Sequence, residues 1–124
     1  MSLNTRTRSH RDIDGYVGCM IMGLPNVTWK NHLKETGLVY KGFGSDKKGQ
    51  TWACVPFYTL YINSAWQVVE KLKPGYSIEI NHEKCAFIDR KTNKIHQHEG
   101  YLPYAISMAA LSTAGFFEKD VIHE

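Results

Sequence analysis

Apolar residues recur at helical spacing near the start of the chain. Five of them stand at positions i, i+3, i+4, i+7 and i+8, which is one face of a helix: Ile13, Tyr16, Val17, Met20 and Ile21. Ser9, followed three residues later by Asp12, can cap the beginning of this helix, and Gly23-Leu24-Pro25 ends it. Gly15 and Gly18 lie inside it, where each costs roughly 1 kcal/mol relative to alanine. We therefore expect another segment to approach the helix closely at these glycines.

The same spacing predicts two further helices. Thr59 offers an N-cap to the first of them, and its apolar face consists of Ile62, Ala65, Trp66, Val69 and Leu72. This phase places Trp66 in the core. The last helix begins at Pro103 and ends at Gly115, and one of its sides is rich in alanine: Ala105, Ile106, Ala109, Ala110 and Ala114.

Between the helices, short runs show β-type patterns. There are five of these runs, at 38–40, 51–55, 76–80, 84–89 and 94–98. The first two predict a hairpin around the glycine-rich loop 42–49, and the other three predict a meander. The resulting order α-β-β-α-β-β-β-α predicts an α+β protein, an α-β-α sandwich in which helices cover an antiparallel sheet.

Composition indicates a single folded domain. The chain has 124 residues, 43% of them hydrophobic, and single domains commonly have about 100–150 residues. We interpret residues 1–10 as a flexible basic arm and 11–124 as one sandwich domain. The formal charge of +3 favours anionic partners only weakly and argues against nucleic acid as a partner. The chain has no apolar run of membrane-spanning length and no C-x-x-C pair, which favours a cytoplasmic protein without a membrane partner.

Two segments resemble the phage ABA sandwich domain, found in small phage and prophage proteins of Bacillus and its relatives. The first is 58–72, where Ala65-Trp66 and Val68-Val69-Glu70-Lys71-Leu72 are the most specific part, and the second contains Pro103-Tyr104-Ala105-Ile106. With Asp12-Ile13-Asp14 at the first helix, the resemblance covers most of residues 11–115. It implies a sheet between helices, no known reaction, and a location in the cytoplasm of a bacterial host.

Aromatic residues before the second helix form a candidate binding site. A helix N-terminus attracts an anion, flat side chains stack on a base or an apolar group, and an amide can orient the ligand. The residues that match these roles are Trp52, Tyr58, Tyr61 and Asn63. Lys47 and Lys48, in the glycine-rich loop, can contact the same anionic ligand.

A zinc site is the alternative in the meander. If a turn at Lys91-Thr92 joins the last two strands, Cys85 lies opposite His98 and Phe87 lies opposite His96. A thiolate and two imidazoles, from Cys85, His96 and His98, can then converge on one ion, as a small metal-dependent enzyme would need. The opposing interpretation is a buried thiol beside solvated histidines, with no metal.

The chain shows no nucleophile elbow and no cysteine–histidine signature. We therefore expect a non-enzymatic phage binding protein without a cofactor. It would dock on a host protein or sequester a small anionic ligand, such as a nucleotide, in a counter-defence role. A nucleic-acid accessory protein using the basic arm and the 47–48 loop is a third hypothesis. Fifteen aromatic residues, more than a thin sandwich buries, and the apolar exit Gly115-Phe116-Phe117 predict a homo-oligomer.

Overall fold

The computed structural model describes residues 5–31, 36–42 and 51–116 of the chain. Within these ranges the helices are α1 (Thr5–Tyr16), the π-helix η1 (Val17–Ile21), α2 (Ile62–Leu72) and α3 (Leu102–Thr113). The strands are β1 (Thr28–Asn31), β2 (Thr36–Gly42), β3 (Thr51–Cys54), β4 (Tyr76–Asn81), β5 (Lys84–Asp89) and β6 (Ile95–Glu99). No helix of the described ranges is long and apolar enough to span a bilayer.

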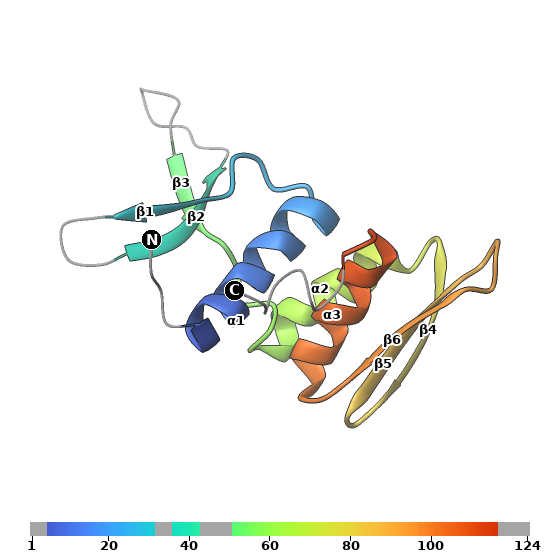
Figure 1. Ribbon diagram of the computed structural model, residues 1–124. Coiled ribbons are helices and arrows are strands. Elements are labelled where there is room, and N and C mark those ends of the chain that lie inside the picture. Colours follow the sequence, from blue (N-terminus) through green and yellow to red (C-terminus); the bar gives the residue numbers. More distant parts are fainter. Residues whose placement is uncertain (1–4, 32–35, 43–50, 117–124) are drawn as a thin grey trace.

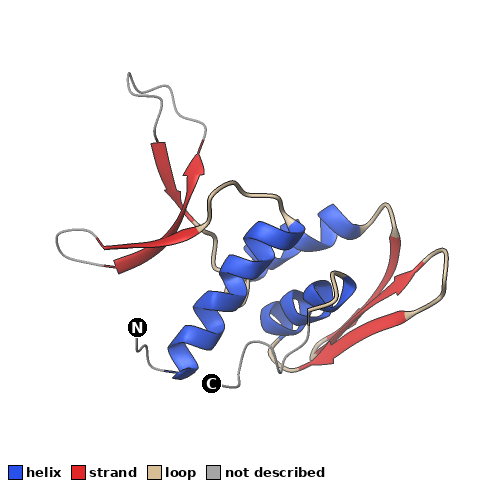
Figure 2. Cartoon of the chain, turned by 45° about the horizontal axis from the view of Figure 1, so that its top comes forward, coloured by secondary structure: helices blue, strands red, loops and turns tan. Residues whose placement is uncertain are grey.

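The strands form two antiparallel sheets, β1-β2-β3 and β4-β5-β6, and the helices lie between them (Figures 1 and 2). The predicted α+β class, the antiparallel pairing and the order of the predicted elements are confirmed. The layering differs from the predicted sandwich: the helices lie between two sheets and do not cover one sheet, because the strands of each half pair only with one another. The structure adds β1, which is too short to show an alternating pattern. All strand pairs are sequence neighbours, and α2 separates β3 from β4. Each half of the chain therefore forms one complete sheet, and the layer of helices lies between the two sheets.

The central element is α3, which is buried nearly all round. Its buried residues are Pro103 and the run from Ala105 to Leu111. Alanines let α2 approach one side while β5 and β6 pack on another. Pro103 stands in the first turn, and Gly115 leaves the helix with φ +84°, a conformation that favours glycine. The predicted start and end of this helix are confirmed.

The predicted phase of α2 is wrong at Trp66. The side that faces the core carries Ala65, Val68 and Val69, while Trp66 is 46% exposed. Small side chains fit against the alanine-rich surface of α3, where an indole would hold the two helices apart. The helix also begins at Ile62, not directly after Thr59, because the backbone at Tyr61 is extended, with φ −105° and ψ 130°. The Thr59 amide donates to the Asp14 carboxylate.

In the N-terminal helix, the backbone of residues 5–10 already belongs to α1. The flexible arm over residues 1–10 stays a prediction. Backbone hydrogen bonding propagates the helix beyond Ser9. The predicted close approach at the two glycines is confirmed. A Cβ atom on Gly15 would lie 3.0 Å from Leu38 Cδ2, and one on Gly18 would lie 3.0 Å from Leu24 Cδ1.

Candidate functional site

A buried ionic contact holds the segment between β3 and α2 on α1. Asp14, only 1% exposed, accepts hydrogen bonds from Arg11 Nη1 at 2.6 Å and from the Thr59 amide at 2.8 Å. Arg11 also donates to the carbonyl oxygens of Val55 at 2.7 Å and Pro56 at 3.2 Å. One salt bridge therefore fixes several backbone groups of residues 55–59, and we call it the Arg11–Asp14 clamp.

Arg11 and Asp14, the two partners of the clamp, have a structural role. Burial raises the pKa of Asp14 above its ordinary value, although the hydrogen bonds from Arg11 and Thr59 oppose this shift. Each carboxylate oxygen already accepts a bond, and the pair lies between α1 and the 55–59 segment. A raised carboxyl pKa marks many general acids, but here its cause is packing around a structural ion pair.

The clamp presents an exposed apolar surface around the N-terminus of α2, which we call the α2 patch. Its members are 37–63% exposed large apolar side chains: Phe57, Leu60, Tyr61, Ile62, Trp66 and Tyr101. Ile62 and Trp66 stand one helical turn apart on α2, and Phe57, Leu60 and Tyr61 immediately precede this helix. Sequence analysis identified only Tyr61 of this set. The other members could have been sought in the nearly unbroken apolar run from residue 55 to 62, because the side chains of such a run cannot all face inward.

Several contacts hold the α2 patch in a defined shape. The Arg11 guanidinium lies 3.8 Å from the centre of the Phe57 ring, a cation–π contact. The ring of Phe57 meets that of Tyr61 edge-on, with 5.9 Å between centroids. The Tyr101 hydroxyl donates to the Leu60 carbonyl at 3.1 Å, which ties the β6–α3 connection to this surface. The patch is therefore pre-organised on the clamp.

The predicted aromatic band divides in the structure. Tyr58 points into the core and is 1% exposed, and burial raises its pKa to about 12. Tyr61 and Asn63 are exposed at the start of α2. The side chain of Trp52 and the residues Lys47 and Lys48 lie outside the described part. Tyr58 and Tyr61 therefore do not face one ligand together.

The strand register predicted for the zinc site is confirmed, since Cys85 pairs with His98 and Phe87 pairs with His96. The side chains of Cys85 and His96 nevertheless do not point to a shared metal ion. Cys85 is buried, and burial raises its pKa to about 12, while His96 Nδ1 lies 2.9 Å from Ser112 Oγ. No group of three His, Cys, Asp or Glu side chains in the described ranges has the geometry to hold a metal ion. This geometry does not favour the metal hypothesis.

The buried His96 should make stability depend on pH. Burial and Lys94 lower its pKa below 6.5, against a smaller opposite effect of Asp89. The unfolded chain therefore binds a proton more readily, and stability present above pH 6.5 is lost as the pH falls through the lowered pKa. We expect the melting temperature of wild type to drop more between about pH 7 and pH 5 than that of His96→Gln. Parallel slopes in thermal melts would contradict this.

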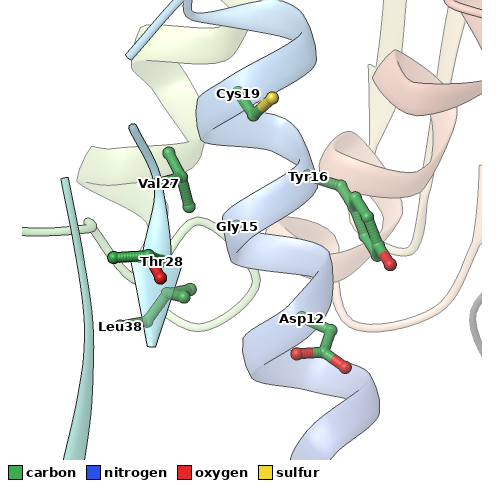
Figure 3. A pocket seen from close by; sticks show the side chains of 7 residues that line it. All are labelled: Asp12, Gly15, Tyr16, Cys19, Val27, Thr28 and Leu38. Atoms are coloured by element: carbon green, nitrogen blue, oxygen red, sulfur yellow. The ribbon is translucent and has the colours of Figure 1, made fainter. Parts of the chain in front are cut away.

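A groove lies between the N-terminal helix and the first sheet, with a volume of about 230 Å³ (Figure 3). Gly15 stands in its middle, with the strand-side residues Val27, Thr28 and Leu38 on one side and Tyr16 and Asp12 on the other. Cys19 of η1 also lines the groove. This groove was not identified from the sequence. One of its walls contains Thr28 of β1, and that strand was not predicted.

No family model matches the chain, so the resemblance to the phage ABA sandwich domain stays a prediction. No curated protein matches it either. Among solved structures, the chain is similar to a phage protein from Bacillus cereus ATCC 14579, with 20% sequence identity and a TM-score of 0.61. The match covers 94% of this chain and 93% of that chain. The two proteins therefore share one fold over nearly their whole length.

Proposed function

We propose that the chain is a non-enzymatic phage protein that binds a host protein through the α2 patch. The observation that carries this proposal is a concentration of exposed apolar side chains. Nine large apolar side chains of the described ranges are exposed, and six of them belong to the α2 patch. Large contiguous apolar surfaces on small proteins mark interaction sites. The phage origin is taken over from the protein of similar fold.

The patch has the size and composition of an interface centre. Aromatic side chains bury roughly 150–250 Å² each, so exposed fractions of 37–63% leave roughly 100 Å² on each of the four aromatic members. These four offer roughly 400 Å², to which Leu60 and Ile62 add, against roughly 800 Å² per partner of a standard interface. Tyrosine and tryptophan dominate binding energy in such interfaces, and charged residues are depleted from their centres. None of the six is ionised at neutral pH.

The geometry favours a protein over a small anionic ligand at this place. A nucleotide would need two flat faces or an enclosed pocket, and Tyr58, which was to supply one face, is buried. A counter-defence role would follow if the bound host protein belongs to an immune system.

Site-specific photo-crosslinking in Bacillus cells tests the proposal. A benzophenone amino acid in place of Tyr61 should give a discrete crosslinked product with a host protein. The same substitution for Glu79, an exposed residue of β4, should not. Adding Trp66→Ala should remove the product while the free energy of unfolding changes by less than about 1 kcal/mol, since Trp66 is half-exposed. Equal products from both positions would overturn the proposal.

Light scattering on the same variants separates a second copy of the chain from a host protein. The predicted homo-oligomer has its own candidate surface in the α2 patch, since one patch on each protomer forms an isologous interface. A dimer that Trp66→Ala dissociates would place the second copy on the patch. A monomer at all concentrations, together with the Tyr61 crosslink, would leave the host protein as the occupant.

A further inference from the structure

We propose that the groove between α1 and the β1-β2-β3 sheet binds a flat aromatic amine. The groove is built from one helix face, since Asp12, Gly15, Tyr16 and Cys19 follow the i, i+3, i+4, i+7 spacing. Val27, Thr28 and Leu38 form the opposite wall (Figure 3). None of these seven residues belongs to the α2 patch, so the proposal is independent of the protein-docking function.

The shape of the groove fits a ring. Gly15, at its centre, is buried and carries no side chain, and Leu38 packs so closely against it that a Cβ atom on Gly15 would lie 3.0 Å from Leu38 Cδ2. Val27 and Leu38 add apolar walls. Tyr16 borders the groove on the other side of Gly15, where its ring packs on that of Phe116 with 4.6 Å between centroids. An apolar cavity of about 150 Å³ accommodates benzene. The groove, with about 230 Å³, has room for a bicyclic ring of similar thickness.

The polar groups of the groove select the charge of the ligand. Asp12 is the only ionised residue among the seven that line it, and none of the seven is cationic. Asp12 already takes part in another interaction, but a carboxylate offers about four acceptor positions and can accept an ammonium in addition. A phosphate or carboxylate ligand would face this negative charge without a counter-charge in the lining. The groove therefore suits an amine and disfavours a nucleotide.

The helix geometry next to the groove gives independent support. The regular α-helix changes into the π-helix η1 at Val17, and the Met22 amide bonds to the Val17 carbonyl at 3.0 Å, five residues back. Such π-turns are rare and occur frequently at functional sites. Here the π-turn contributes Cys19 to the lining of the groove, and Cys19 carries a free thiol.

Three indoles of the same ring and different charge serve as probes: tryptamine, indole and indole-3-acetate. Titration followed by two-dimensional NMR should shift the amides of residues around Gly15, Val27 and Thr28. We expect tryptamine to bind with a Kd of about 1 mM or tighter, indole more weakly, and indole-3-acetate most weakly. Asp12→Asn should weaken tryptamine about tenfold and leave indole unchanged, because only the ammonium uses the carboxylate.

Two tryptophan substitutions provide the matched control. Cys19→Trp places an indole in the groove from an exposed position and should abolish binding of tryptamine. Met20→Trp adds the same side chain at the next residue, which is exposed and does not line the groove, and should leave binding unchanged. Circular dichroism melts establish that both variants fold. The proposal is overturned if none of the probes shifts the groove amides, if Cys19→Trp binds tryptamine like wild type, or if indole-3-acetate binds as tightly as tryptamine.

Discussion

Tyr58→Ala should lower the free energy of unfolding by about 3–5 kcal/mol, as expected for the loss of a buried aromatic side chain. Tyr58 is among the largest fully buried side chains of the described ranges and belongs to the main core cluster. It lies in the clamped segment directly before α2, with Asp14 of α1 and Tyr40 of β2 near its hydroxyl, so the change opens a cavity in the core. Chemical denaturation followed by circular dichroism measures the effect.

The hydroxyl of Tyr58 provides a second measurement. Burial, and to a smaller extent Tyr40 and Asp14, raise its pKa from 10.0 to about 12. The unfolded chain then loses the proton first, so the stability that depends on the neutral phenol is present below pH 10.0 and is lost as the pH rises toward about 12. Tyr58→Phe should lack this loss. Tyr61→Ala, in the exposed α2 patch, is the matched control, and a cost equal to that of Tyr58→Ala would show that the assignment of inward and outward tyrosines is wrong.

The elements that sequence analysis located best are those whose pattern is local. The meander 76–99 was predicted within about one residue, with the register of Cys85 on His98, because alternation and polar turns leave few other pairings. The start of α3 at Pro103 and its end before Gly115 also follow from residues inside the element. These features need no knowledge of the rest of the chain.

The wrong predictions concern features of α2 that depend on contacts with residues far away in the sequence. Two faces of α2 carry apolar residues at helical spacing, Ile62 with Trp66 on one and Ala65 with Val68 and Val69 on the other. Only the alanine surface of α3 decides that the second face is buried. The segment before α2 depends in the same way on Asp14, which is 45 residues away and accepts a hydrogen bond from the Thr59 amide. Sequence periodicity therefore predicted that α2 exists but not which face it exposes, and the candidate site is on that face.

The α2 patch shows why its members were not found together. Tyr101 is separated from Leu60 by 41 residues, and its hydroxyl joins the patch through a single hydrogen bond. What distinguishes Phe57 within its run of apolar residues is the contact of its ring with the Arg11 guanidinium. A surface assembled by such long-range contacts has no sequence motif, and of its six members only Tyr61 was predicted to belong to a site.

Asp14→Ala should be the most destabilising polar substitution, at about 3–5 kcal/mol, because it leaves Arg11 buried without its counter-ion and the Thr59 amide without its acceptor. Glu70→Ala is the matched control. Glu70 also forms an i, i+3 pair, with Lys73 at 3.6 Å, but both side chains are more than half exposed, so its loss should cost less than about 1 kcal/mol. Chemical denaturation of both variants gives the comparison.

The double variant Arg11→Met/Asp14→Leu separates the ion pair from its backbone contacts. Removing both charges should restore part of the loss, since no buried charge is left unpaired, and burial disfavours the ionised form of Asp14 in wild type. Recovery should stay incomplete, because Arg11 also donates to the Val55 and Pro56 carbonyls and covers the ring of Phe57. Crosslinking from Tyr61 should then fall although the chain folds. If Asp14→Ala costs no more than Glu70→Ala, the clamp does not hold the 55–59 segment, and the pre-organisation of the α2 patch must have another origin.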